Sequence, residues 1–333
     1  ETGSISGPVA IHADAAGEAI YVLHGIRSAR LIALDANLVE VADTDTPFSA
    51  SPPPEVTAPP QGGRVYATHP SMGIVIAYDG RLNEVARISL DDLPTGRSHT
   101  RSLVATDDGF LYVVQGTQVR VFDSQSDFQR DTAIEERFSA ALATAGMMPL
   151  DACADDRNNI MLFDVEEGRV LILNYLGEVI SETEIELSAT RASHRNLHGF
   201  SVDPIGNYYL VDEGNHRILK FNRAGKFVTK IGTLGVDPGD LQAPQDIAVF
   251  GDGSLLVADT YNNRVQRMQL TATPIVLPEV AQLGVQFAER ERTADRALER
   301  MDSVRASIKP LRPVGNFTGA IVAGGSSLGL AWL

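Results

Sequence analysis

Three carboxylates recur at one place in a repeated pattern, and they are the residues best suited to chemistry in this chain. Several copies of the pattern begin with a proline: Pro8, Pro53, Pro149 and Pro244. The second residue after this proline is acidic in three copies, as Glu55, Asp151 and Asp246. Carboxylate oxygens are the ligands that a hard divalent cation prefers. The acids therefore predict a metal site if the fold brings them together; the alternative is that each one only caps its own strand.

The pattern is clearest between His198 and Met268, where it is written twice. Residues 199–218 and 246–265 both read as strand, glycine turn, strand, polar turn and strand, and the second copy follows 47 residues after the first. A period of roughly 40–50 residues with several short strands is typical of a β-propeller blade. Fainter copies upstream give six units between about residues 5 and 277. The three acids come from alternate units, which would place them around the axis of a six-membered ring.

The polar turn in the clearest units resembles the NHL repeat, whose signature is Asp, Asn and Arg at this spacing before an apolar strand. One copy has Asp212, Asn215 and Arg217, and the next matches it residue for residue. A carboxylate that ends one strand can pair with a guanidinium that opens the next. We therefore expect structural pairs within the blades, with the third one weaker than the others: Asp212–Arg217, Asp259–Arg264 and Asp164–Arg169.

The predicted fold class is all-β, a six-bladed NHL-type β-propeller with a C-terminal α-helix and an apolar tail. The propeller is expected over residues 1–277 and is clearest at 150–270. Six-bladed propellers that resemble the gluconolactonase and paraoxonase group hold calcium in the central channel. That resemblance makes Ca²⁺ the ion for the three acids and gives the chain an alternative function as a metal-dependent hydrolase or lyase. Amidating lyases share the NHL-like ring, but their metal-binding histidines have no matching set among the seven histidines here.

Two stretches outside the repeated strands are predicted to be helical. Apolar residues at helical spacing over 131–145 predict a short helix with Asp131 as its cap. Residues 278–309 form a longer amphipathic pattern, which either packs against the propeller or joins another chain in a coiled coil. Residues 310–333 form an apolar tail, uncharged from Pro313 onward, which is read as a hairpin or as a membrane segment. Six apolar residues are expected to bind a partner: Phe287, Met301, Ile308, Phe317, Leu330 and Trp332.

Charge argues against one class of partner. The chain has a net charge of −15, and residues 1–270 alone carry 37 acidic and 21 basic side chains. Such a surface repels phosphate, so nucleic acid is a poor expectation. The single cysteine, Cys153, excludes an internal disulfide framework. The opening residues Glu1, Thr2 and Gly3 look like a processed end, which favours an extracytoplasmic place or a larger assembly without fixing the localisation.

These observations predict a non-catalytic scaffold, a binding or assembly module docked to a protein partner, to further copies of itself or to a larger particle through its C-terminal helix and tail. Contact of the tail with a membrane is left open. No cofactor is expected, apart from calcium if the three acids form a metal site. Fold alone does not assign function, so the hydrolase or lyase alternative stands beside the binding module.

Overall fold

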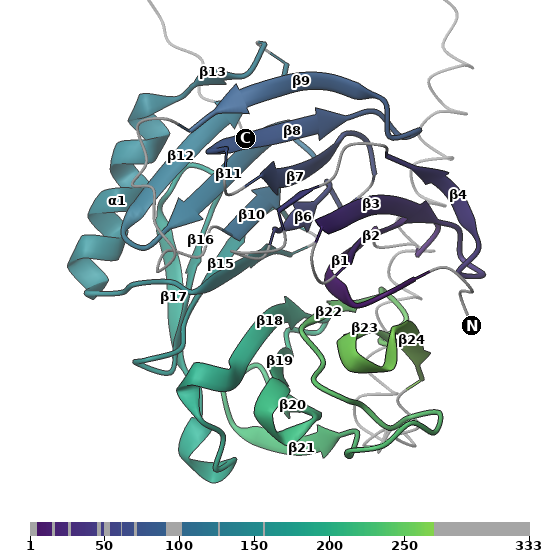
Figure 1. Ribbon diagram of the computed structural model, residues 1–333. Helices are drawn as coiled ribbons and strands as arrows, with labels where there is room; N and C mark the ends of the chain where they lie inside the picture. The colour runs from purple at the N-terminus through teal and green to yellow at the C-terminus, as the bar shows by residue number, and fades with distance from the viewer. Residues whose placement is uncertain are drawn as a thin grey trace, which may run out of the picture. The chain divides into compact units, whose positions relative to one another are not determined.

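The computed structural model describes residues 5–269, except 15–16, 26–27, 45–47, 50–53, 61, 70–71, 91–101, 126 and 156. Within these residues the fold is all-β with one α-helix, and the strands form six antiparallel sheets (Figure 1). The predicted helix at 278–309 and the tail at 310–333 lie outside the described residues.

Each sheet is a blade built from strands that follow one another in the chain. Blade 1 contains β1 (Pro8–Ala13), β2 (Ile20–His24), β3 (Ser28–Leu34) and β4 (Glu40–Asp43), with β5 (Phe48–Ser49) also paired to β3. Blade 2 contains β6 (Val56–Thr57), β7 (Val65–His69), β8 (Ile74–Tyr78) and β9 (Glu84–Ser89). Blade 3 contains β10 (Ser102–Ala105), β11 (Phe110–Gln115), β12 (Gln118–Asp123) and β13 (Gln129–Arg130).

The second half of the ring repeats this order. Blade 4 contains β14 (Asp151–Ala154), β15 (Ile160–Asp164), β16 (Arg169–Leu173) and β17 (Val179–Glu184). Blade 5 contains β18 (Leu197–Val202), β19 (Tyr208–Asp212), β20 (Arg217–Phe221) and β21 (Phe227–Ile231). Blade 6 shows three strands among the described residues: β22 (Asp246–Val249), β23 (Leu255–Asp259) and β24 (Arg264–Met268).

The first strand of each blade lies innermost, and these six strands close a ring. Each of β1, β6, β10, β14 and β18 contacts the first strand of the next blade, and β22 contacts β1. Figure 1 shows the labelled inner strands around a common centre. At the closure, the Gly7 amide donates to the Asn263 side chain at 3.0 Å and the Thr260 hydroxyl donates to the Pro8 carbonyl at 2.7 Å. The six-bladed prediction is confirmed.

The one α-helix of the described residues is α1 (Thr132–Ala145), which packs beside β12 of blade 3 (Figure 1). The Asp131 carboxylate accepts a hydrogen bond from the Ile134 amide at 3.0 Å, which satisfies a free donor at the helix start. The helix ends at Gly146, whose φ of 64° suits glycine. Phe138 and Leu142 are fully buried against blades 3 and 4. The predicted helix and its cap are both present.

The polar turns of blades 5 and 6 contain the expected ion pairs. Arg217 lies 2.8 Å from Asp212, and the same distance joins Arg264 to Asp259. Both aspartates are fully buried and also accept from an asparagine of the turn. Each arginine donates in addition to carbonyls of the loop that enters its own blade. These pairs therefore fasten the loop to the blade as well as one strand to the next.

The third expected pair is not made. Asp164 and Arg169 face each other in register, but the Arg169 guanidinium binds Glu182 at 2.7 Å, and its Nε atom has no hydrogen-bond partner. The Asp164 carboxylate accepts instead from backbone amides, including that of Met148 at 2.7 Å. The outer strand of blade 4 supplies a competing carboxylate, and the spacing within the turn does not encode that competitor.

Candidate functional site

Glu55, Asp151 and Asp246, the channel acids, occupy equivalent positions at the start of three inner strands. Asp151 is the first residue of β14 and Asp246 the first residue of β22, while Glu55 immediately precedes β6. The corresponding residues of the other three blades are small: Ala10, Ser102 and Gly199. Strand register places Ala10 and Ser102 there, whereas Gly199 is the unpaired residue at a register shift in β18. Acidic and small residues thus alternate around the ring, as the repeated pattern predicts.

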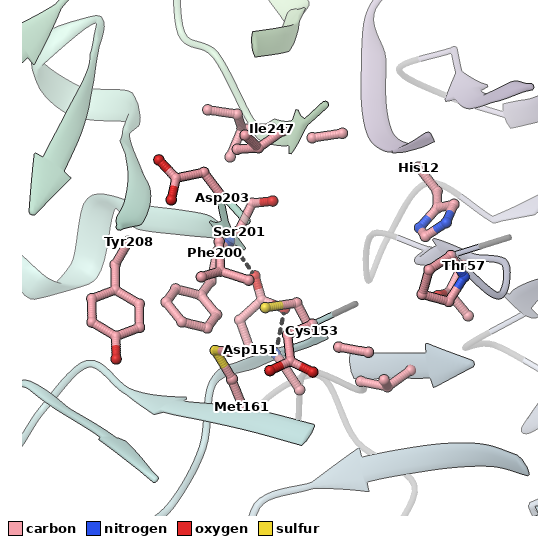
Figure 2. A pocket seen from close by; sticks show the side chains of 18 of the residues that line it. His12, Thr57, Asp151, Cys153, Met161, Phe200, Ser201, Asp203, Tyr208 and Ile247 are labelled. Atoms are coloured by element: carbon pink, nitrogen blue, oxygen red, sulfur yellow. Dashed lines mark hydrogen bonds between the residues drawn. The ribbon is translucent and has the colours of Figure 1, made fainter. Parts of the chain in front are cut away.

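The channel acids line one cavity of about 780 Å³ that follows the inner strands. Its lining begins at the acids and extends along the inner strands to Arg157, in the turn after β14, and to Arg223, in the turn between β20 and β21. Figure 2 shows part of this lining, with His12 and Thr57 together on one side and Asp151 and Cys153 across from them. The acids therefore form one end of the cavity, and the two arginines belong to the other.

Asp151 and Asp246 each connect two neighbouring blades. Asp246 accepts from the amide of the next residue, Ile247, at 2.8 Å and from the amide of Ile11 in blade 1 at 2.7 Å. Asp151 accepts in the same way from Ala152 and from Phe200 in blade 5, both at 2.7 Å. Two backbone donors hold each carboxylate, so both side chains are fixed at the channel wall. Each of these two acids therefore caps the backbone of its own strand, as the alternative to a metal site predicts, and also caps the inner strand of the next blade.

Ser102 plays the same part between blades 3 and 4. Its hydroxyl donates to Asp151 at 2.9 Å and accepts from the Ala152 amide at 3.0 Å. Gly199 has no side chain for such a contact, and none would fit there. Its φ is +47°, and a Cβ atom would lie 2.9 Å from the Cα of Asp246. The absence of a side chain at Gly199 lets the inner strands of blades 5 and 6 approach each other.

Glu55 differs from the two aspartates because no described residue donates a hydrogen bond to its carboxylate. Its own amide donates to the Thr68 hydroxyl at 2.7 Å, which fixes the backbone and leaves the carboxylate facing the cavity. Burial raises the pKa of Glu55 well above its usual range, and the nearby charges of Asp151 and Asp246 raise it further. Glu55 is therefore the channel acid that is free to bind a ligand.

The other two acids also hold their protons more tightly than usual. Burial raises the pKa of Asp246 to about 8, and the charge of Asp151 adds to the effect. Burial raises the pKa of Asp151 as well, although its hydrogen bonds from Ala152, Phe200 and Ser102 oppose the shift. An opposite charge nearby stabilises carboxylates that like charges and burial destabilise. A positively charged ligand at this end of the cavity would supply that charge.

A second ring of side chains lies two residues further along the inner strands. It includes His12, Thr57, Cys153 and Ser201. The Nε2 atom of His12 is buried without a hydrogen-bond partner, and burial lowers the pKa of His12 to about 4. At neutral pH the imidazole is therefore uncharged and does not neutralise the channel acids. Burial likewise raises the pKa of Cys153 well above its usual range, so its thiol is protonated.

Comparison with known proteins identifies one of the repeats. A family model described as the NHL repeat matches residues 241–268, which contain Asp259, Asn262 and Arg264 of blade 6. The network that these three side chains form is the one expected for that repeat. The protein is a six-bladed β-propeller that contains an NHL repeat, hereafter the NHL propeller.

One curated relative shares a short stretch with this NHL propeller. This relative is the probable peptidyl-alpha-hydroxyglycine alpha-amidating lyase pgal-1 of Caenorhabditis elegans, and the two chains are 38% identical over 71 residues. The matched stretch is 20% of this chain and spans only 20% of the length of that relative. Among the described residues of the NHL propeller, no group of three or more His, Cys, Asp or Glu side chains is arranged to hold a metal ion.

Solved structures share the fold. The hydrazine synthase of Kuenenia stuttgartiensis matches with a TM-score of 0.54 and 13% identity, over 81% of this chain and 97% of that one. A protein of unknown function from Bacteroides thetaiotaomicron matches with a TM-score of 0.57 and 14% identity, over 79% of this chain and 69% of that one. At these identities the likeness concerns the propeller architecture alone.

The sequence identified the channel acids but missed two neighbours, Ser102 as a hydrogen-bond partner and His12 as a lining residue. A signal for His12 was present, because residues two apart on a strand face the same side. The six residues predicted to bind a partner lie outside the described residues: Phe287, Met301, Ile308, Phe317, Leu330 and Trp332. In the part of the chain that the structure describes, no helix is long and apolar enough to cross a membrane.

Proposed function

We propose that the NHL propeller is a non-catalytic binding module that takes a small organic cation, a protonated amine, into its central channel. One observation carries this proposal. The Glu55 carboxylate faces a cavity of about 780 Å³, accepts no hydrogen bond from a described residue, and lies within the electrostatic influence of two further acids, Asp151 and Asp246. Ligand sites are commonly cavities of about 300–1,000 Å³ with a few convergent polar groups.

An organic cation suits the site better than a bare metal ion. Ca²⁺ takes about 6–8 oxygen ligands from all sides. Asp151 and Asp246 already direct both of their oxygens to backbone amides, so they offer charge rather than a complete coordination shell. An ammonium group needs only a few acceptors and a favourable potential. Glu55 would accept the hydrogen bond, and the two aspartates would supply the field.

The direct test is a calorimetric titration of the full chain with propylammonium at pH 8, beside uncharged 1-propanol of the same shape. We expect propylammonium to bind and 1-propanol not to bind. Glu55→Gln keeps the side-chain size and imitates the protonated acid, so it should fold normally and lose at least tenfold in affinity. Equal binding of the amine by wild type and Glu55→Gln would refute the channel site.

The metal-dependent hydrolase or lyase is a second candidate, because the three channel acids line one cavity and because a matching stretch occurs in a probable lyase. A titration with Ca²⁺ separates the two. Binding of Ca²⁺ that depends on Glu55 and exceeds the affinity for propylammonium would favour the metal-dependent reading. Calcium binding that survives Glu55→Gln would lie elsewhere on this acidic surface.

Docking through the C-terminal helix and tail is also part of the proposal. The binding module would then present its channel from a partner, from an assembly of its own copies or from a particle. The apolar pattern of residues 278–333 supports this part.

A further inference from the structure

The cavity is not confined to the channel but also enters the interface between blades 4 and 5. The cause lies in one row of neighbouring residues that crosses each blade from strand to strand. The row begins on the inner strand, two positions after the channel acid or after the small residue that replaces it. The second member of the row is tyrosine in blades 1, 2, 3 and 5: Tyr21, Tyr66, Tyr112 and Tyr209. It is Met161 in blade 4 and Leu256 in blade 6.

These tyrosines fill the space toward the next blade. Tyr66 of blade 2 packs with Leu103 and Leu111 of blade 3. Tyr209 of blade 5 packs with Ile247 and Leu255 of blade 6. All four tyrosines are buried. A tyrosine at this position is therefore the ordinary plug of an interface between blades. Blades 4 and 6 lack it, and of the two replacements Met161 lines the cavity whereas Leu256 does not.

Without this plug, the row of blade 4 lines the cavity from the channel to the rim. Cys153 of β14 pairs with Met161 of β15, Met161 with Ile172 of β16, and Ile172 with Ser181 of β17. All four residues line the cavity. One residue from every strand of the blade thus forms one wall of an opening, which we call the blade 4/5 cleft.

Aromatic side chains of blade 5 form the opposite wall. Phe200 and Tyr208 line the cavity and stack with ring centroids 6.0 Å apart, and Phe163 of blade 4 stacks on Phe200 at 5.2 Å. Figure 2 shows Met161, Phe200 and Tyr208 on the same side of the pocket, away from His12 and Thr57. A thioether facing aromatic rings makes an adaptable apolar slot for a flat group.

We propose that the blade 4/5 cleft is the specificity pocket of the channel, and that it receives an aromatic or branched apolar group attached to the amine. This rests on the proposed function, because the channel acids would hold the ammonium group. Asp151 and Cys153 are two residues apart on β14, so the cleft begins about 7 Å along the strand from the end of the cavity that the acids form. An apolar group joined to nitrogen through two to four bonds spans this separation.

The test compares two amines, propylammonium and 2-phenylethylammonium, on the full chain. Wild type should bind the phenyl compound at least tenfold more tightly. Met161→Tyr installs the tyrosine that four other blades have, so this preference should disappear while propylammonium binding is unchanged. Met161→Leu, which copies blade 6 without filling the cleft, should keep the preference. A preference that survives in a folded Met161→Tyr protein would overturn the proposal.

The only cysteine of the chain provides a second readout in wild type. Methyl methanethiosulfonate should modify Cys153 slowly at pH 8.5, and saturating 2-phenylethylammonium should slow the modification at least fivefold, whereas propylammonium should not. Equal protection by both amines would place the phenyl group outside the cleft and overturn the proposal. Failure of the proposed function is distinguishable from these results, because then propylammonium itself would not bind.

Discussion

At the scale of single residues, the channel acids connect the fold to its proposed ligand. Asp246 spans two blades through backbone hydrogen bonds to Ile247 and Ile11, yet its pKa is raised to about 8. The fold therefore keeps protons on groups that an unfolded chain would release in neutral solution. Both the stability of the ring and the affinity of the channel must depend on pH for this reason.

Stability should fall as the pH rises between about 4, the usual aspartate value, and about 8. The folded protein binds a proton at Asp246 that the unfolded chain has lost over this range, so the favourable contribution is complete below the lower value and disappears above the upper one. Asp246→Asn removes this contribution to the slope. Denaturant unfolding at pH 5 and pH 9 should give a smaller difference for the variant, and identical differences would contradict the shift.

Binding of the amine should depend on pH in the opposite direction. A cation needs the ionised form of the channel acids, so the affinity for propylammonium should rise from pH 6 to pH 8.5 and binding should release protons. Calorimetry in two buffers of different ionisation enthalpy measures the number of protons released. Affinity that is independent of pH would place the ligand away from Glu55.

Gly199 offers a test of the close approach between blades 5 and 6. Gly199→Ala should destabilise the protein strongly, because a Cβ atom would lie 2.9 Å from the backbone of Asp246. The matched control is Gly253→Ala, where φ is also positive but no atom lies within 4 Å of the added Cβ. That control should cost only about 1–2 kcal/mol, the strain of the left-handed backbone. Equal losses in urea unfolding would show that the contact with Asp246 is unimportant.

At the scale of elements, the polar turns show which structural features repeat spacing can predict and which it cannot. The fold and the alternation of acids were predictable, because a period of strands and turns fixes both the architecture and the residues that face the axis. The failure at Arg169 has a physical cause, since a long guanidinium selects among all nearby carboxylates and Glu182 lies on another strand. The blade 4/5 cleft was also missed. Its signal is a methionine at a position where four of the other five blades have tyrosine. That difference has meaning only once this position is known to face the next blade.

The pairs in the turns should differ in strength accordingly. Arg217→Ala leaves the fully buried Asp212 without its guanidinium, and breaking a buried pair costs about 3–5 kcal/mol. We expect the lower end of that range, because Asn215 still donates to the carboxylate. Arg169→Ala is the matched control at the same repeat position and should cost clearly less, since Asp164 does not rely on it. Urea unfolding of both variants would decide, and equal losses would be evidence against the pairing.

At the scale of the whole molecule, the ring closes within residues 5–269, and the predicted helix and tail at 278–333 lie outside the described residues. Deleting residues 278–333 should therefore leave the thermal unfolding of the ring and the binding of propylammonium unchanged. We expect the deletion to abolish self-association or attachment to a partner, measured by light scattering and by sedimentation. A truncated protein that unfolds would show that the tail completes the ring, and an unchanged assembly state would remove the docking role.

The closure of the ring also determines how the molecule responds to force. Among the described residues, no strand of blade 1 pairs with a strand of blade 6, and the seam is held by side chains such as Asn263, Thr260 and Asp246 together with an apolar cluster. Hydrogen bonds inside each blade are loaded together along a ladder, whereas the contacts of the seam are separate. A pull on the two ends of the ring would therefore part blade 1 from blade 6 before any sheet unravels. The propeller would then open at this seam into a chain of intact blades.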